Sequence, residues 1–443
     1  MMTTQKTIDN NRVTPLAVTN WRDIRKIFGI KQKNRRGHIY LIGKTGTGKS
    51  TLIANMMISD INQGSGAALI DPHGDLVEEV LDFIPEERLA DVIYFNPSDI
   101  EYPIAFNPLE SVPPDGRYLV ASGLISVFKK IWPEFWGPRL EHILRHALLT
   151  LLECPGSSLI DLPRILVNKE FRAEKVAQVV DQQVREFWFL EFERYSAWLK
   201  SEAVAPILNK VGQFLTSPIL RNIVGQRKNT FDVKTVMDEG KILIVNLSKG
   251  KLGEDITSLL GAMIVTKIQL AAMARATVPE EERRPFYLFV DEVHNFLTLS
   301  FANILSEARK YGLNLTVAHQ YIEQLDEKIS AAIFGNVGTI ISFRIGAEDA
   351  KFLNREFYPV FNETDLVNLP NHDICIKLMI DGITSNAFSA TTLPPPEKRR
   401  SYKTEIIALS RERYGKPRDE VEAETAYREI VVAKKCSKQG KLF

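Results

Sequence analysis

The sequence has few cysteines and no excess of one charge, and each of these absences excludes a class of protein. Its cysteines, Cys154, Cys375 and Cys436, lie far apart and form no CxxC pair. This spacing argues against a disulfide framework or a zinc knuckle and favours a reducing compartment. The 56 Lys and Arg residues balance 55 Asp and Glu residues, so the formal net charge is +1. No global basic field exists to bind nucleic acid, and any such binding must come from local clusters.

A signal peptide and a long apolar run are also missing. The N-terminal MMTTQKTIDNNR contains no apolar stretch. The longest apolar run, residues 259–274, is short for a bilayer and carries Lys267 and Gln269 in its interior. We therefore expect no membrane span and a cytoplasmic location. The 443 residues, 44% of them hydrophobic and 25% charged, predict a large folded core with an insertion.

Short apolar runs that end in Gly, Asp or Asn alternate with helical patterns over much of the chain, as is typical of a parallel α/β sheet. The expected strands are residues 38–42, 67–70, 92–95, 242–245, 286–290, 313–317, 337–343 and 374–379. Between the third and the fourth, residues 113–235 have an almost entirely helical pattern, which includes the stretches 138–152 and 184–200. This region predicts an all-helical inserted domain.

The expected domain boundaries follow from this pattern. In chain order we expect a basic N-terminal arm, the first part of the sheet domain, the helical insertion, the second part of the sheet domain and a charged helical tail: residues 1–36, 37–112, 113–235, 236–395 and 396–443. The arm is predicted because residues 21–36 hold seven Lys and Arg against a single acid, Asp23. The Pro-rich TTLPPPEKRR is typical of a linker before the tail.

A glycine-rich motif of the form GxxxxGK(S/T) follows the first expected strand. Its residues are Gly43, Lys44, Thr45, Gly46, Thr47, Gly48, Lys49, Ser50 and Thr51. The motif stands between a strand and a helical pattern, as a phosphate-binding loop requires. Its glycines let backbone N–H groups cradle phosphate oxygens, and the dipole of the following helix favours the same anion. Lys49 would reach the β and γ phosphates, with the Ser50 hydroxyl on Mg2+.

A second apolar strand, FYLFV, ends in two acids, Asp291 and Glu292. Asp291 would hold the Mg2+ through water, and Glu292 is placed to orient and deprotonate an attacking water. Paired acids at a strand end are common, but the phosphate-binding loop favours a functional pair. The guanine motif NKxD is missing, because Asn209-Lys210-Val211-Gly212 lacks the acid, and no LSGGQ occurs. The residues therefore favour ATP and the ATPase group that includes ring motors.

Six motifs in one order carry a resemblance: GKTGTGKST, LIDPHGDL, FNPLE, LFVDEVHNF, EARKYGLNLTVAHQY and GNVGTIISFRIG. Together they resemble the HerA/FtsK superfamily of hexameric DNA-pumping ATPases, and most closely its coupling-protein branch, which serves conjugation and type IV secretion. The resemblance spans about residues 37–395. It implies an α/β fold of the RecA-like P-loop NTPase class, with a central, mostly parallel sheet and an all-α inserted domain. It also implies a homo-hexamer, DNA as a partner, and secretion-channel or relaxase-type proteins as further partners.

The resemblance assigns roles to matching residues. Gln320 resembles a sensor that touches the γ phosphate or the attacking water. Arg309 resembles an arginine finger that enters the neighbouring subunit's site, with Arg344 in reserve; the alternative is that Arg309 complements a helix C-terminus. The element Asp71-Pro72-His73-Gly74-Asp75 would lie beside the nucleotide. His142 and His146 are one helical turn apart, but no third metal ligand is indicated, and surface histidines are favoured.

DNA in a ring would be held by Lys and Arg side chains that contact phosphates. Lys249, Lys251 and the basic arm are the candidates, and solvated surface is the alternative for each. Other functions stay open. The chain would otherwise be a nucleotide-gated assembly factor or protein-export ATPase that moves no polymer, or a HerA-like end-processing helicase, for which 36 residues before the first strand are too few to form an N-terminal β-barrel.

Overall fold

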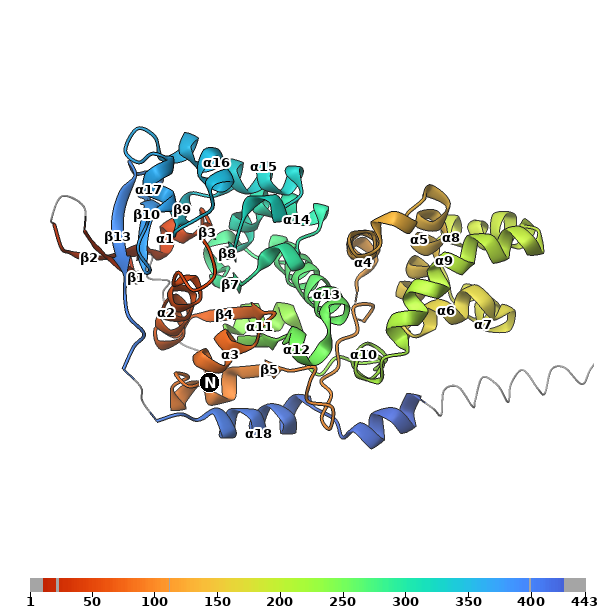
Figure 1. Cartoon of the computed structure of the whole chain (residues 1–443). Helices are drawn as coiled ribbons and strands as arrows, with labels where there is room; N and C mark the ends of the chain where they lie inside the picture. The colour runs from red at the N-terminus through yellow and green to blue at the C-terminus, as the bar shows by residue number, and fades with distance from the viewer. Residues whose placement is uncertain (1–10, 21–23, 111, 398–399, 426–443) are drawn as a thin grey trace, which may run out of the picture. The chain divides into compact units, whose positions relative to one another are not determined.

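The computed structural model describes residues 11–20, 24–110, 112–397 and 400–425 (Figure 1). The chain divides into two compact units. The sheet unit consists of Met1–Phe95, Val233–Gly250 and Ala271–Leu409. The helical unit consists of Asn96–Asp232, Lys251–Leu270 and Ser410–Phe443. The helical unit therefore contains most of the expected insertion and also takes in two segments from elsewhere in the chain.

An 11-stranded sheet forms the centre of the sheet unit, in the order β2-β1-β13-β10-β9-β3-β8-β7-β4-β6-β5. The strands are β1 (Val13–Thr19), β2 (Ile27–Lys31), β3 (Ile39–Ile42), β4 (Gly66–Asp71), β5 (Val92–Phe95), β6 (Ile242–Asn246), β7 (Phe286–Val290), β8 (Leu313–His319), β9 (Thr339–Ser342), β10 (Asp373–Lys377) and β13 (Phe388–Thr392). From β9 to β5 neighbouring strands are parallel. The remaining four pair antiparallel. A small separate hairpin joins β11 (Met379–Ile380) to β12 (Ile383–Thr384).

All eight strands expected from the sequence are present, but the expected N-terminal arm is wrong for its described part. Residues 13–19 and 27–31 form β1 and β2, which pair with each other, and β1 also pairs with β13 at one side of the sheet. Pro15 lies at a bulge in this pairing, and Gly29 interrupts the apolar pattern of β2. Within sheets, proline is confined to edge strands and bulges, and glycine weakens a strand interior, so Pro15 at the bulge of β1 and Gly29 in the edge strand β2 both occupy tolerated positions. Local composition therefore concealed these strands.

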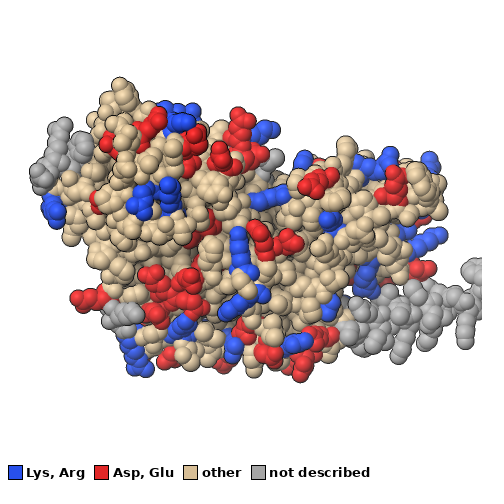
Figure 2. All heavy atoms as spheres, viewed as in Figure 1, with Lys and Arg blue, Asp and Glu red and all other residues tan. Residues whose placement is uncertain are grey.

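Four basic side chains of the expected arm form ion pairs within the sheet unit. The ion pairs join Lys31 and Lys33 to Asp381, Arg35 to Asp60, and Arg36 to Glu280. Arg35 is only 1% exposed. On the face in Figure 2, Lys and Arg are interspersed with Asp and Glu. Four of the arm's charges thus have acidic partners, which weakens the arm as a candidate for binding DNA phosphates.

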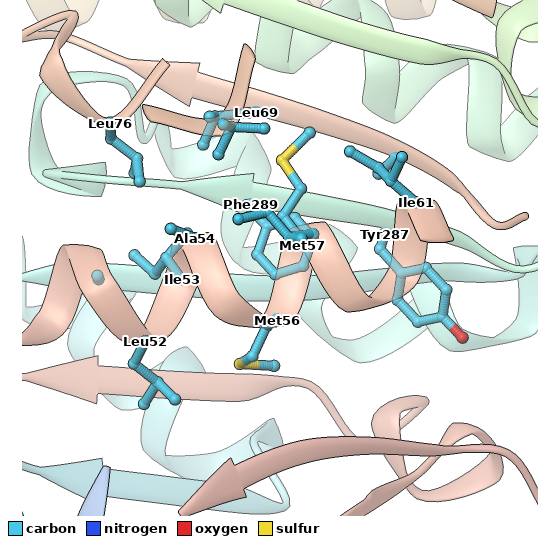
Figure 3. Close-up of a cluster of buried hydrophobic side chains, with 14 of the residues drawn as sticks. Leu52, Ile53, Ala54, Met56, Met57, Ile61, Leu69, Leu76, Tyr287 and Phe289 are labelled. Carbon is cyan, nitrogen blue, oxygen red and sulfur yellow. The ribbon is translucent and has the colours of Figure 1, made fainter. Parts of the chain in front are cut away.

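Helices cover both faces of the sheet. The helices of the sheet unit are α1 (Gln32–Arg35), α2 (Lys49–Asn62), α3 (Asp75–Leu81), α11 (Val233–Glu239), α14 (Leu299–Glu307), α15 (Glu327–Asn336), α16 (Ala347–Phe357) and α17 (Glu363–Val367). Both α12 (Lys249–Leu252) and α18 (Lys403–Tyr414) begin in the sheet unit and end in the helical unit, and α13 (Glu254–Met273) belongs mostly to the helical unit. Figure 3 shows the cluster between α2 and the sheet, which includes Leu52, Ile53, Met56, Met57, Leu69 and Phe289. On the other face, the Tyr40 ring lies 5.1 Å from that of Phe334 in α15. Alternate residues of β3 therefore face opposite helical layers.

The inserted region is helical, as expected. It contains α4 (Arg117–Ile131), α5 (Pro138–Glu153), α6 (Asp161–Val167), α7 (Lys169–Val176), α8 (Gln182–Glu186), α9 (Ala197–Leu215) and α10 (Pro218–Val224). The single helix expected over 184–200 is wrong. The chain leaves α8 through a π turn and a 3-10 turn, and α9 starts afresh at Ser196, whose hydroxyl accepts the Leu199 N–H at 3.2 Å. Serine favours this capping position over a helix interior.

Two further expectations concern the apolar run and the tail. Within the described residues, one helix, Glu254–Thr277, is long and apolar enough to cross a membrane, but 67% of its most apolar window is buried in the fold. The core helix of a soluble protein gives the same signal. In the tail, α18 is helical and its Ile406 is fully buried, so this part packs on the sheet unit's core. The tail from residue 426 onward lies outside the described residues.

Candidate nucleotide site

The glycine-rich loop leaves the carboxyl end of β3 and leads directly into α2. Gly46 and Gly48 have φ angles of 75° and 115°, a region that side chains rarely adopt. A Cβ on Gly48 would lie 2.7 Å from Nδ1 of His372, so the loop has no room for one. The loop thus requires glycine at this point, as the motif predicts. Thr47 is fully buried and its hydroxyl donates to the Lys44 carbonyl at 2.7 Å, which stabilises the turn.

Lys49 is 6% exposed, and its side chain folds back onto the loop that precedes it. Its ammonium donates to the carbonyls of Gly43 at 2.6 Å and Lys44 at 3.2 Å. Burial lowers the pKa of Lys49, while the charges of Glu292 and Asp291 act in the opposite direction. Asp291 and Glu292 therefore lie close enough to the Lys49 ammonium for their charges to affect its pKa.

Asp291 lies one residue past β7, and Ser50 is the second residue of α2. The Ser50 hydroxyl donates to the Asp291 carboxylate at 3.3 Å, so the two expected Mg2+ ligands meet. Burial, and then the charges of Glu292 and Asp71, raise the pKa of Asp291 to about 6. Crowded, desolvated carboxylates resist ionisation unless a cation joins them.

Glu292 is 6% exposed and has a left-handed backbone, with φ 44° and ψ 50°. Gln320 follows β8, which lies beside β7 and β3, and its side-chain amide donates to Glu292 Oε1 at 2.7 Å. Glu292 Oε2 lies 3.4 Å from Nδ1 of His294. The structure thus brings the expected base and the expected sensor into direct contact.

The DPHG element follows β4 and borders the same site. The Asp71 carboxylate is fully buried and accepts the backbone N–H groups of His73 at 2.8 Å, Gly74 at 2.9 Å and Val77 at 3.2 Å. These bonds fix the turn and the start of α3. The sequence left the role of this element open, and the structure shows that Asp71 holds the loop in shape.

These elements enclose a cleft of about 640 Å3, within the size range of small-molecule sites. Its lining residues are Thr45, Gly46, Gly48, Lys49, Ser50, Thr51, Asp71, His73, Asp75, Leu76, Glu79, Asp291, Glu292, Gln320 and His372. Most of the expected site residues meet here. The sequence did not indicate Glu79 or His372. His372 lies between β9 and β10 and belongs to no sequence motif. Its backbone is left-handed (φ 68°), and its backbone N–H donates to the Thr47 carbonyl, which holds it against the glycine-rich loop.

The two candidate arginine fingers lie at opposite edges of the sheet. Arg309 precedes β8 and is exposed at the amino edge, away from its own chain's loop. Its charge adds to burial in lowering the pKa of His38, which precedes β3, to about 4. Arg344 instead lies beside the loop, where its guanidinium donates to the Leu369 carbonyl at 3.3 Å and to Asn371 at 2.8 Å. Arg344 is thus engaged within its own chain.

The remaining candidates lie outside the cleft. Lys251 is exposed, and the Lys249 ammonium donates to Asn295 Oδ1 at 2.8 Å. In the helical unit, the His142 ring pairs with Glu191 at 3.0 Å, and the His146 ring stacks on Phe187. Over the part of the chain that the structure describes, no cluster of three or more His, Cys, Asp or Glu side chains is suited to a metal ion.

A glycine-rich anion cradle, a buried lysine, and a Ser–Asp pair beside a Glu–Gln pair, all at the carboxyl edge of a parallel sheet, define the P-loop nucleotide-binding class. A model of the family described as the type IV secretion-system coupling protein DNA-binding domain matches residues 23–355. The chain belongs to this family. The resemblance to coupling proteins drawn from the motifs is thereby confirmed.

Comparison with solved structures supports the fold. Plasmid coupling protein TrwB in complex with ADP and Mg2+ has a TM-score of 0.61 and 17% identity, over 91% of this chain and 95% of that one. TrwB in complex with the GTP analogue GDPNP has a TM-score of 0.60 and 17% identity, over 88% and 91%. VirB4 of Thermoanaerobacter pseudethanolicus has a TM-score of 0.55 and 14% identity, over 89% and 99%. At these identities the likeness establishes the RecA-like P-loop fold. No curated protein matches the chain significantly.

Proposed function

We propose that this protein is an ATPase of the coupling-protein type that assembles as a homo-hexamer and moves DNA in conjugation or type IV secretion. One observation carries the proposal. The Gln320 amide, the Glu292 carboxylate, the Asp291–Ser50 pair and the Lys49 ammonium lie in one cleft. These are the groups that hydrolysis of a nucleoside triphosphate requires.

The residues of the cleft fit ATP and Mg2+. The loop has the backbone of an anion cradle, with no room for a Cβ at Gly48, and the raised pKa of Asp291 marks a site short of positive charge. Ser50 and Asp291 would hold the Mg2+, which supplies charge neutralisation at the phosphates. TrwB, which shares this fold, has been observed with ADP and Mg2+.

The chain's own groups then have distinct tasks. Lys49 would exchange its bonds to loop carbonyls for bonds to the β and γ phosphates. Glu292 would orient the attacking water and accept its proton, because its side chain lines the cleft and its Oε1 is held by Gln320. Gln320 would shift when the γ phosphate leaves, since it bonds to the group beside that phosphate.

The ring and the DNA complete the proposal. Arg309, exposed at the amino edge, would stabilise charge in the neighbouring subunit's site, so hydrolysis would depend on assembly. The family description names a DNA-binding domain, and Lys249 and Lys251 after β6 are the candidates for phosphate contacts. The family match supports DNA over a purely protein cargo.

A DNA-stimulated ATPase assay tests this function. Lys49→Ala should abolish turnover, and Glu292→Gln should lower it about 10²–10⁴-fold while ATP still binds. Lys241→Met, at the opposite end of β6, is the control and should behave as wild type. Single- or double-stranded DNA should raise the wild-type rate several-fold. A rate that ignores DNA and responds to a protein partner would instead indicate an assembly or export ATPase.

A further inference from the structure

The loop after β6 is fixed at its backbone to the turn that borders the cleft. Leu247 N–H donates to the Asp71 carbonyl at 2.9 Å, and Lys249 N–H donates to the Pro72 carbonyl at 2.8 Å. In the sheet, β4 lies between β6 and β7. The side chain of Lys249 therefore passes over the end of β4 to reach Asn295, in the 3-10 turn Val293–Asn295 that follows β7.

Asn295 is 7% exposed and contacts the backbone of Glu292. Its side-chain amide donates to the Glu292 carbonyl at 2.9 Å, and its backbone N–H donates to the same oxygen at 3.0 Å. Glu292 has the left-handed backbone that residues other than glycine rarely adopt. Two donors on one carbonyl are what keeps this turn, and with it the direction of the Glu292 side chain, in place.

Lys249 determines which way the Asn295 amide points. An ammonium only donates, so it requires the amide oxygen, and the NH2 group must then face the Glu292 carbonyl. If the Asn295 amide were flipped, its NH2 group would face the Lys249 ammonium and its oxygen would face the Glu292 carbonyl, and both bonds would be lost. The bond from Lys249 thus selects the single amide orientation that supports Glu292.

We propose that Asn295 is the positioning residue for Glu292 and that Lys249 sets its orientation, so that a DNA phosphate bound by Lys249 steadies the Glu292 turn and raises hydrolysis. This inference rests on the proposed function. An ammonium has three N–H donors, so one bond to Asn295 is compatible with a phosphate as a second acceptor. Lys249 is then more than a DNA contact, because it links the binding of a DNA phosphate at this loop to the position of the Glu292 carboxylate.

A double-mutant cycle on turnover without DNA tests the link between the two residues. Lys249→Met and Asn295→Ala should each lower kcat about tenfold, with KM for ATP within about twofold, because a misplaced catalytic group affects chemistry more than binding. The double variant should be no slower than Asn295→Ala, since both changes break one chain of contacts. If the fold reductions in kcat of the two single variants instead multiply in the double variant, the two residues act independently and the inference is wrong.

Controls separate positioning from folding. Asn295→Asp keeps an acceptor for Lys249 but loses the donor to Glu292, so it should match Asn295→Ala in kcat. Lys241→Met and Asn336→Ala, which remove an ammonium and an amide elsewhere in the sheet unit, should leave kcat unchanged. All rates are taken per ATP-binding site. A loss of sites or of melting temperature at unchanged kcat would show a merely structural role and refute the inference.

Measurements with DNA distinguish failure of the inference from failure of the proposed function. Asn295→Ala should bind DNA with wild-type affinity and lose its stimulation, whereas Lys249→Met should lose both. Stimulation that survives in Asn295→Ala would overturn the coupling. If wild type itself ignores DNA, the proposed function fails and the coupling to DNA fails with it, while the cycle without DNA still decides whether Lys249 and Asn295 position Glu292.

Discussion

Removal of the Asp60 carboxylate is expected to loosen the N-terminal hairpin from the rest of the sheet unit. Arg35 Nη1 lies 2.6 Å from both carboxylate oxygens of Asp60, and the Thr14 hydroxyl of β1 donates to the same carboxylate at 3.0 Å. Arg35 and Asp60 are 1% and 2% exposed. The guanidinium also lies 3.9 Å from the centroid of the Tyr287 ring. This cluster joins β1 and α1 to α2 and β7.

The magnitude follows from the burial of both partners. Asp60→Ala leaves a guanidinium buried without its counter-charge, and the loss of one partner of a buried pair costs about 3–5 kcal/mol. At about 1.4 kcal/mol per tenfold, amide protection in β1 and β2 should fall by about two to three and a half powers of ten. The double variant Arg35→Met/Asp60→Leu removes both charges and should restore most of the protection, since apolar replacement of a buried pair is often neutral.

Hydrogen exchange is the suitable assay because it resolves the hairpin. Tryptophan fluorescence would report mainly on the helical unit, which holds Trp132, Trp136, Trp188 and Trp198. Asp381→Ala breaks the exposed pairs of Lys31 in β2 and Lys33 in α1 and should leave the protection unchanged. Unaltered exchange in Asp60→Ala, or a double variant as unprotected as the single one, would refute the reasoning.

Three further predictions concern the site, the ring and the helical unit. Mg2+ binds the ionised carboxylate, and the pKa of Asp291 is raised to about 6, so Mg2+ affinity should be steady above about pH 7 and fall about tenfold per unit well below pH 6; a flat Mg2+ titration across this range would contradict it. Because the folded value exceeds the unfolded one, the metal-free protein should also lose stability as the pH rises through about 6, and Mg2+ should restore it. When Arg309→Ala protein is mixed into wild type, ATP turnover should fall more steeply than the fraction of variant subunits rises. A fall in strict proportion to that fraction would exclude a site shared between subunits. Asn107→Ala removes donors to the Ser157 and Arg227 carbonyls and should cost about 1–3 kcal/mol, read as a lower urea midpoint of tryptophan fluorescence.

The sequence predicts the central strands well and the outer strands poorly, for a physical reason. The central parallel strands are buried on both faces, so β3, β4, β6 and β7 are mostly apolar runs, whereas β8 is equally buried and includes Asn314 and Thr316. Strands β1, β2 and β13 are partly exposed and include Pro15, Gly29 and polar Thr391. The helix expected over 184–200 failed because apolar periodicity alone does not reveal the restart at Ser196.

The same distinction applies to the site. The loop residues and the acids Asp291 and Glu292 are each contiguous in sequence, so a local pattern reveals them. The contact of Lys249 with Asn295 joins positions 46 residues apart, and no local pattern encodes it. Arg35 was taken as part of a basic arm for a similar reason, since its partner Asp60 is 25 residues away. Charge counted along the chain cannot distinguish a free surface cation from a buried, paired one.

Strand β8 connects the proposed catalytic roles of two adjoining subunits. Gln320 follows its carboxyl end, where it contacts the base of its own chain, and Arg309 precedes its amino end. Seven residues at about 3.3 Å each separate the two by about 23 Å, a span that no side chain crosses. Arg309 therefore cannot serve the site of its own chain. In the proposed ring, one buried strand would hold the sensor of one site and the finger of the next, and a displacement at Gln320 would be passed to Arg309 by a rigid element.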